Sequence, residues 1–307
     1  QLRGRRVDRA HEPLGPVLSR PARRAAKKAK TPPDLELEAG ARAHFEDPVY
    51  YSDTYDWRDE DVVYYRDVAL KRGRVLEHGI GNGRVALPMA RAGVHVTGLD
   101  HTPAMLDHLR ELLKQEPPAV RRRIELHQGD VRTTRLGKRF PLVICPFNAA
   151  LHLYTRVDVE QWLARVREHL EAGGELVFDI SMPVPGDLAR DPNVPYRIPP
   201  FEHPTAGRVS YREHFDYDRV RQVLFVSMYF EPAPRKTKTK AKTKQITETF
   251  MTPLAQRQFY PQEMEALLHY NGFDVKELYG DFERGPLVQT SDVMVWHVTP
   301  RARGAKR

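Results

Sequence analysis

The stretch RVLEHGIGNGR, residues 74–84, decides the fold of this chain. Its first five residues are typical of a short buried strand, and three glycines at alternate positions, Gly79, Gly81 and Gly83, follow directly. Glycine lets the backbone turn sharply and approach a ligand without a clash at Cβ. Helical periodicity begins at residue 84, and the first turn of a helix leaves its N–H groups free. We therefore expect a strand, a ligand-binding glycine loop and a helix in that order.

The alternation of strand and helix continues along the chain. We predict strands at residues 74–78, 95–100, 124–128, 142–146 and 175–180, and helices at 84–92, from 102 onward and at 157–170. After an interruption, the alternation resumes with a helix at 261–270 and strands at 273–279 and 292–298. Strands that alternate with helices indicate an α/β protein with a parallel, doubly wound sheet.

A segment of different periodicity interrupts this alternation. Three stretches with a period of two, residues 208–217, 222–230 and 245–254, predict antiparallel strands of an insertion at about 195–255. Residues 235–244 are mostly alternating Lys and Thr, which suits an exposed hairpin end because like charges resist edge aggregation. An exposed antiparallel insertion of this kind could also mediate a homodimer.

Composition divides the rest of the chain. Residues 1–40 are rich in Arg, Ala, Pro and Lys and lack apolar periodicity, which predicts a disordered basic tail. Residues 301–307 form a second basic tail, so the folded domain is expected over 41–300. Aromatic residues are dense in the segment 45–70, which we interpret as an N-terminal lid.

The formal net charge of +8 is unevenly distributed. Lys and Arg concentrate in residues 1–33, 235–244 and 301–307, which leaves the remainder acidic. We therefore do not expect the folded body to bind nucleic acid, although the basic segments could touch polyanions. The one cysteine, Cys145, excludes an intramolecular disulfide and fits a cytoplasmic protein. No run approaches the ~20 apolar residues that a membrane-spanning helix needs.

The glycine loop is compatible with two classes of cofactor. A dinucleotide fingerprint reads G-x-G-x-x-G, but here Arg84 stands at the third glycine position and Gly83 comes one residue early. Glu77 precedes the first glycine by two residues. A carboxylate there would repel a pyrophosphate, whereas it suits the α-ammonium group of S-adenosylmethionine (SAM). The loop therefore favours SAM, and a nicotinamide cofactor is the alternative.

Acidic residues follow the next two predicted strands. Asp100 ends the second strand about 20 residues beyond the loop, where a carboxylate binds ribose hydroxyls; this fits both cofactors equally. After the third strand, Asp130 could accept the adenine amino group while Val131 packs on the ring. His101 and Met105 are placed to flank the adenosine. A helix cap for Asp100 and a surface turn for Asp130 are the alternatives.

These residues together carry a family resemblance. The segment from Val75 to Ile180 resembles class I SAM-dependent methyltransferases, with VTGLD at 96–100, Gly129-Asp130 and EAGG at 171–174 in the expected order. Over about 45–298, the chain is similar to a bacterial subgroup akin to sugar-amine and other small-molecule N-methyltransferases. FNAALHLY at 147–154 is one of the stretches that carry this wider similarity.

The resemblance implies a fold and a cofactor. The fold is the Rossmann-like class I methyltransferase fold, a seven-stranded mixed sheet ordered 3-2-1-4-5-7-6 with helices on both faces. The β insertion lies between the fifth strand and the last helix. The cofactor is SAM, and the product is S-adenosylhomocysteine (SAH). The Asp/Asn-Pro-Pro-Tyr/Phe signature of DNA-amino methyltransferases is absent, since residues 145–148 read CPFN. This weakens the case for the amino group of a DNA base as the methyl acceptor.

The remaining site residues follow from location. Pro146 ends the predicted fourth strand and Asn148 follows it, and we place both with the cofactor-binding residues. His152 and Tyr154 follow at the edge where open α/β sheets bind ligands, and we predict them as catalytic. His152 would act as a base or orient the acceptor; its alternative role is core packing or helix capping. Tyr55 of the lid could offer its ring to the sulfonium, a contact worth roughly 0.5–2 kcal/mol.

The sequence thus predicts an enzyme that transfers a methyl group in line to N or O of a small molecule, such as an amino sugar or a small amine. One alternative is a protein or RNA methyltransferase guided by the basic tails. Another is a SAM-binding module without turnover. Arg84 and Glu77 disfavour a nicotinamide-dependent oxidoreductase. The thirteen histidines show no H-x-x-x-H spacing, so no metal site is expected.

Overall fold

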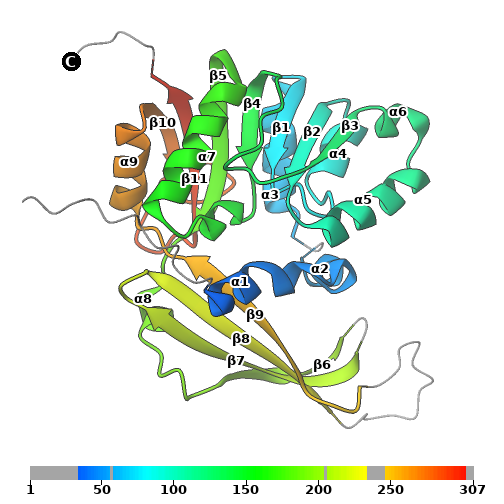
Figure 1. Ribbon diagram of the computed structural model, residues 1–307, viewed down its shortest axis with the longest axis vertical. Helices are drawn as coiled ribbons and strands as arrows, with labels where there is room; N and C mark the ends of the chain where they lie inside the picture. The colour runs from blue at the N-terminus through cyan, green and yellow to red at the C-terminus, as the bar shows by residue number, and fades with distance from the viewer. Residues whose placement is uncertain (1–33, 56–57, 204–205, 234–245, 302–307) are drawn as a thin grey trace, which may run out of the picture. The chain divides into compact units, whose positions relative to one another are not determined.

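The computed structural model describes residues 34–55, 58–203, 206–233 and 246–301. They form a seven-stranded sheet in the order β10-β11-β5-β4-β1-β2-β3 (Figure 1). The strands are β1 (Arg74–His78), β2 (His95–Asp100), β3 (Ile124–Gln128), β4 (Phe140–Cys145), β5 (Leu170–Ser181), β10 (Phe273–Tyr279) and β11 (Val293–Pro300). The predicted class I methyltransferase order is confirmed.

Strand direction determines where a site can form. β3, β2, β1, β4 and β5 run parallel to one another, whereas β11 runs antiparallel to both β5 and β10. The carboxyl ends of the parallel strands therefore lie along one edge of the sheet. The glycine loop, Asp100 and the turn after β4 meet at that edge because they follow β1, β2 and β4.

Helices cover both faces of this sheet, and the sequence of β5 explains why. Leu176, Phe178 and Ile180 belong to one buried cluster, and Val177 belongs to the other. Successive side chains of a strand point to opposite faces, so β5 is buried on both sides. One face carries α7 (Arg156–His169) and α9 (Pro261–Tyr270); the other carries α3 (Glu60–Leu70), α4 (Ala86–Arg91) and α5 (Pro103–Gln115).

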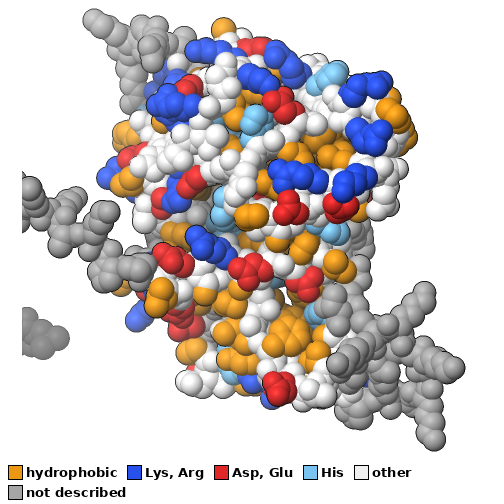
Figure 2. Space-filling model, turned by 45° about the vertical axis from the view of Figure 1, so that its right-hand side comes forward, with side chains coloured by type: hydrophobic (Ala, Val, Ile, Leu, Met, Phe, Trp, Pro, Cys, Tyr) orange, Lys and Arg blue, Asp and Glu red, His pale blue; other side chains and the backbone are white. Residues whose placement is uncertain are grey.

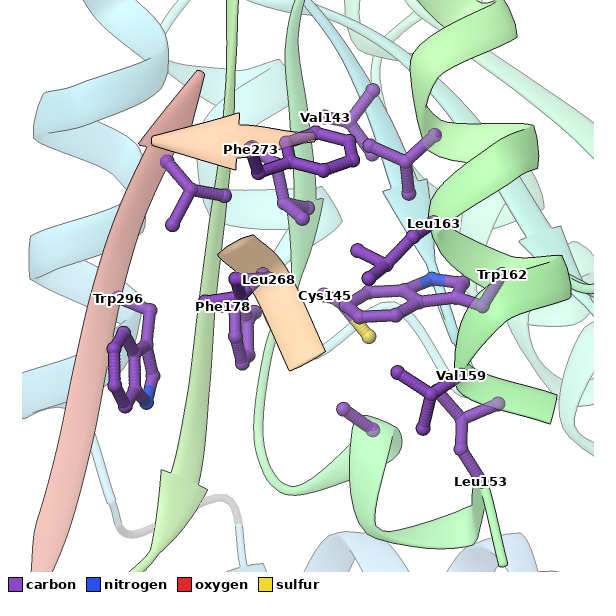
Figure 3. Close-up of a cluster of buried hydrophobic side chains, with 14 of the residues drawn as sticks. Val143, Cys145, Leu153, Val159, Trp162, Leu163, Phe178, Leu268, Phe273 and Trp296 are labelled. Atoms are coloured by element: carbon purple, nitrogen blue, oxygen red, sulfur yellow. The ribbon is translucent and has the colours of Figure 1, made fainter. Parts of the chain in front are cut away.

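Large aromatic side chains fill the first of these clusters. Trp162 of α7 packs edge-to-face on Phe178, with ring centroids 5.5 Å apart (Figure 3). Trp296 of β11 stacks beside Phe178 at 6.1 Å. Cys145 is buried in the same cluster, and burial raises the pKa of its thiol, as expected for a packing residue.

The insertion forms a second sheet that is antiparallel throughout, in the order β6-β7-β8-β9. Its strands are β6 (Tyr196–His203), β7 (Gly207–Asp218), β8 (Val223–Pro232) and β9 (Phe250–Arg257). Three of them were expected, with β9 beginning later than the predicted 245. β6 escapes sequence reasoning because Pro199 and Pro200 interrupt it; prolines are tolerated on an edge strand, and the register shifts there. The predicted Lys/Thr hairpin end at 235–244 lies outside the described residues.

The prediction of a disordered tail over 1–40 is wrong for its last residues. Residues 35–40 belong to α1 (Leu35–Arg42), which Asp34 caps by accepting a hydrogen bond from the Leu37 backbone N–H at 3.2 Å. α1 packs on β9, where a Cβ at Gly40 would lie only 2.7 Å from Cβ of Ala255. Residues 1–33 and 302–307 lie outside the described part of the chain.

The predicted lid over 45–70 divides into two different structures. η1 (Ala43–Phe45) and α2 (Pro48–Tyr55) supply residues to the cavity described below. α3 instead packs on the sheet, where Tyr65 is fully buried, so its part of the lid prediction is wrong. Its tyrosines are core residues because the helix precedes β1 and covers the same sheet.

Charged side chains of both signs share the surface. Figure 2 shows acidic and basic groups interspersed over the upper part of the face in view. Several are paired, as Arg91 is with Glu116 and Lys138 with Glu125. None of the helices in the described ranges is long and apolar enough to cross a bilayer.

Candidate cofactor and acceptor site

A cavity of about 470 Å³ opens at the carboxyl edge of β1, β2 and β4. Its volume falls in the usual range for small-molecule sites. Eleven of the predicted site residues line it: Glu77, Gly79, Gly81, Asp100, His101, Met105, Asp130, Val131, Pro146, His152 and Tyr154. Leu37, Phe45 and Tyr51 of the N-terminal helices line it as well, so two remote segments of sequence enclose one site.

Three predicted site residues do not line this cavity. Gly83 has a φ of 84°, and a Cβ there would overlap Leu109 of α5, so this glycine serves helix packing. Asn148 accepts hydrogen bonds from the backbone N–H of Ser181 at 2.7 Å and from its hydroxyl at 3.1 Å. Tyr55 hydrogen-bonds to His44 and lines a second cavity instead.

Asp100 connects the glycine loop with the end of β2. One carboxylate oxygen accepts the Gly81 N–H at 2.9 Å, and the other accepts the Thr102 N–H at 2.8 Å. Gly79 and Gly81 have φ values of 75° and 53°, which glycine adopts without strain. The carboxylate therefore shapes the loop and also faces the cavity that the loop borders.

Glu77 is buried beside the cavity with an unsatisfied oxygen. Its side chain is 2% exposed, and Oε2 has no hydrogen-bond partner among the described residues. Burial raises the pKa of Glu77 well above its ordinary value, and the nearby Arg84 only partly opposes this. Arg84 itself pairs with Asp61, at 2.9 Å from Nη1 to Oδ1. A ligand ammonium would compensate this carboxylate, so the site fits SAM.

A charged network that the sequence did not reveal holds Asp130 at the rim of the cavity. Arg132 binds both oxygens of Asp130 and also pairs with Asp158 of α7. Burial alone would raise the pKa of Asp130, but the hydrogen bonds from Arg132 lower it. Asp130 is therefore ionised and held in place, ready to accept further hydrogen bonds.

The turn after β4 is held in an uncommon conformation. Phe147 and Asn148 have φ values of 55° and 64°, a region that residues other than glycine rarely adopt. The Phe147 N–H donates to buried Asp179 at 2.8 Å, and the Arg84 guanidinium lies 4.4 Å from the Phe147 ring centroid. Supported backbone of this kind is common at ligand sites. Asp179 and Arg84 act from other elements, which is why sequence reasoning missed them.

The contacts of Tyr154 assign the tautomer of His152. The Tyr154 hydroxyl donates to the carbonyl oxygen of Ala255 at 3.0 Å, so it accepts from Nδ1 of His152, also at 3.0 Å. The proton therefore resides on Nδ1, and Nε2 keeps its lone pair. Within the described ranges nothing hydrogen-bonds to Nε2. Burial lowers the pKa of His152 to about 4, so the ring is neutral near pH 7.

His152 also packs against Phe45, with ring centroids 5.3 Å apart. The residue thus combines a packing contact with a free lone pair at the cavity. In the part of the chain that the structure describes, no three His, Cys, Asp or Glu side chains are grouped to hold a metal ion.

Sequence comparison identifies one domain. Residues 75–174 match the family model of a methyltransferase domain. The chain is 34% identical over 113 residues to dTDP-3-amino-3,4,6-trideoxy-alpha-D-glucopyranose N,N-dimethyltransferase of Streptomyces venezuelae, a match that covers 37% of this chain and 40% of that protein. The similarity therefore spans about two fifths of the relative's length.

Comparison with solved structures extends over more of the chain. The CcbJ methyltransferase from Streptomyces caelestis superposes with a TM-score of 0.68 at 24% identity, covering 85% of this chain and 99% of that one. A SAM-bound amino pentose methyltransferase from Micromonospora echinaspora gives a TM-score of 0.57 at 21% identity, with 82% and 95% coverage. At these identities the likeness establishes a shared fold, and it includes the predicted Rossmann-like core.

Proposed function

We propose that this chain, whose residues 75–174 match the model of a methyltransferase domain, is an enzyme that transfers the methyl group of SAM to a nitrogen or oxygen of a small molecule. The observation that carries the proposal is the buried Glu77 carboxylate, whose Oε2 lacks a partner beside the cavity. A ligand with an ammonium group satisfies it, and the pyrophosphate of a dinucleotide does not. Relatives named as amino-sugar N,N-dimethyltransferases support an amino sugar or small amine as acceptor.

The residues of the cavity divide between the parts of SAM. Glu77 would bind the α-ammonium group, Asp100 the ribose hydroxyls and Asp130 the adenine amino group. Val131 and Met105 would supply apolar contact with the adenine. SAM brings a methyl group that is already electrophilic, so the protein's task is to align the acceptor and exclude water. Alignment of this kind is worth roughly 7–11 kcal/mol.

We assign His152 the role of orienting the acceptor. A histidine with a pKa of about 4 is a poor base for an alkylammonium group of pKa about 10. Transfer of that proton to His152 would cost roughly 8 kcal/mol at about 1.36 kcal/mol per pKa unit. An amine acceptor would therefore arrive neutral and donate an N–H to Nε2 of His152. This hydrogen bond would point the lone pair of the amine nitrogen away from the imidazole ring.

The aromatic residues of the cavity would keep water from the reacting atoms. Tyr51 of α2 and Phe147 of the β4 turn lie edge-to-face, with centroids 6.3 Å apart. Both line the cavity together with Phe45. A cation near such rings gains roughly 0.5–2 kcal/mol, which favours the sulfonium of SAM over neutral SAH.

Two further parts of the proposal concern the protein's setting. We place the enzyme in the cytoplasm, where its one thiol at Cys145 would remain reduced. We also propose a homodimer through the insertion, whose edge strand β6 exposes Tyr196 and Ile198. Sedimentation of the wild type and of an Ile198→Lys variant would test the dimer, since the charge should shift the equilibrium toward monomer.

Calorimetric titration with SAH and with NADH tests the cofactor. We expect micromolar SAH binding that an Asp100→Ala variant loses, and no NADH binding. Preference for NADH would overturn the proposal. Tight SAH binding without turnover of any amine or amino sugar would instead favour a binding module.

A macromolecular acceptor is the second candidate, and the basic segment 1–33 is the feature that favours it. Deleting that segment separates the two. If the segment steers a protein or RNA, the deletion should lower the affinity for that acceptor and reduce its salt dependence, because fewer counterions are released on binding. Turnover of a small acceptor would not change.

A further inference from the structure

A second cavity of about 650 Å³ is lined by other residues than the cofactor cavity. It lies between α2 and one face of the insertion sheet. α2 contributes Tyr50, Ser52 and Tyr55, and the sheet contributes residues that include Tyr211, Glu213 and Phe215. Aromatic and aliphatic side chains dominate this lining.

The strand pattern of β7 places one carboxylate inside this apolar lining. Tyr211, Glu213 and Phe215 alternate along β7 and so share a face, and Glu213 is paired in register with Met228 of β8. Glu202, the other acid of the lining, is exposed and pairs with Arg208. Glu213 is therefore the acid that a ligand in the cavity would meet.

Glu213 has capacity to bind a further donor. Its Oε1 accepts a hydrogen bond from the Tyr211 hydroxyl, and nothing else described hydrogen-bonds or ion-pairs with it. Burial raises the pKa of Glu213; Asp187 of α8 (Pro185–Leu188) adds to the rise, and Tyr211 and Arg190 oppose it. Arg190 is already paired with Asp187 at 2.8 Å. The carboxylate thus lacks a dedicated cation.

We propose that this cavity binds an organic cation, an ammonium group carried on an apolar or ring-shaped body. Oε2 of Glu213 would receive the charge, and the surrounding aromatic rings would stabilise it through their faces. Val226, Met228 and Leu254 would contact the body. A neutral ligand would leave the carboxylate unpaired, and an anion would be repelled.

The occupant would contact the helix that also borders the cofactor cavity. Ser52, in the second cavity, accepts a hydrogen bond from Nδ2 of Asn82 in the glycine loop at 2.8 Å. The Tyr55 ring lies 5.1 Å from that of Phe147, which lines the cofactor cavity. α2 is thus a shared wall. The amine could belong to the methyl acceptor or to a separate metabolite; both sources have the same recognition chemistry.

Titration of the full chain with benzyltrimethylammonium, followed by NMR or calorimetry, tests the cation site. Benzyl alcohol serves as the neutral probe. We expect millimolar or tighter binding of the cation, at least about tenfold weaker binding in Glu213→Gln, and weaker binding of the alcohol. Glu231→Gln is the matched control, because Glu231 lies on the other face of the sheet, paired with Arg212. Its affinity should equal that of the wild type.

A second variant keeps the test valid if Glu213→Gln folds poorly. Tyr211→Phe frees Oε1 of Glu213, so it should bind the cation as well as or better than the wild type. Equal affinity for the two probes, or unchanged affinity in Glu213→Gln, would overturn the proposal. So would a lack of cation binding up to about 20 mM.

Inhibition kinetics with the first amine found to be methylated distinguish the two sources. Competitive inhibition by the probe makes the cavity part of the acceptor site. Noncompetitive inhibition, or none, assigns it to a separate ligand. The cation site rests on the proposed function only for its link to an acceptor. The binding experiment does not depend on turnover, so failure of the cation site and failure of the methyltransferase proposal can be distinguished.

Discussion

Oδ1 of Asp179 accepts the backbone N–H of Phe147 at 2.8 Å, which joins β5 to the turn that follows β4. The same oxygen accepts the Tyr65 hydroxyl at 2.6 Å. A single buried atom therefore ties α3, the central sheet and the cavity wall together. The rare backbone conformation at Phe147 is stabilised by a partner 32 residues away in the chain.

Asp179→Asn should change how stability depends on pH. Burial raises the pKa of Asp179 from 3.8 to about 6, so between these values the folded protein holds a proton that the unfolded chain has lost. Its contribution to stability therefore falls as pH rises from about 4 to about 6, by roughly 3 kcal/mol. Asparagine keeps the accepting oxygen but does not titrate. Urea unfolding should show that the free energy of unfolding of the variant, relative to that of the wild type, is higher at pH 7 than at pH 4.5. The same difference at both pH values would contradict this.

Glu77→Gln should separate cofactor affinity from stability. Glutamine cannot pair with the α-ammonium group, so we expect SAH affinity to fall at least about tenfold, as for loss of a charged hydrogen bond. The free protein should melt at the same or a higher temperature, since glutamine removes a carboxyl group whose ionised form is penalised by burial. Calorimetry and thermal unfolding check both, with Glu231→Gln as the surface control. Unchanged SAH affinity would refute the role of Glu77.

Alanine substitutions at two glycines of the loop should affect different properties, SAH affinity at one and stability at the other. Gly81→Ala places a Cβ at the cavity with no atom closer than 4.0 Å, so it should reduce SAH affinity with a stability loss of only about 1 kcal/mol. Gly83→Ala overlaps Leu109 and should cost stability by about 1–3 kcal/mol. Denaturation and SAH titration of the two variants form a crossed test. Equal effects of both substitutions on both quantities would show that the assignment is incorrect.

His152→Ala should lower turnover by about 10- to 100-fold while leaving SAH affinity unchanged, because it removes orientation of the acceptor. Tyr154→Phe should produce a smaller loss, since it removes only the partner of Nδ1. The imidazole, with a pKa of about 4, is neutral throughout pH 6 to 8, so a change in its protonation should not alter the rate in that range. Steady-state rates for an amine acceptor provide the measurement. A step near pH 6.5 that vanishes in His152→Ala would contradict the neutral assignment.

Local patterns predicted most of this fold. The loop after β1, the acids after β2 and β3 and the alternation on β5 each depend on neighbours in sequence, so their positions followed from spacing. β6 was missed because two prolines hide its alternation, although a partner on one side is enough to hold it. α1 was missed because it is only eight residues long and follows directly on the basic tail, and its contact with β9 depends on tertiary structure.

The site was predictable to the same extent and for the same reason. Residues that touch the cavity from the strand ends were found, whereas the groups that hold them were not. Arg132 was overlooked because its value lies in bridging Asp130 to Asp158, which is distant in sequence. Gly83 was assigned to the cofactor because its spacing does not reveal that Leu109 lies against it.

The position of β11 between β5 and β10 has a consequence for biosynthesis. β5 ends at Ser181 and β11 begins at Val293, so about 110 residues, the whole insertion included, are made before β5 gains this neighbour. β10 emerges earlier, yet within the described chain it joins the sheet through β11 alone. During synthesis one hydrogen-bonding edge of β5 therefore remains unpaired until β11 is made. An unpaired strand edge makes a nascent chain prone to aggregation and to chaperone binding.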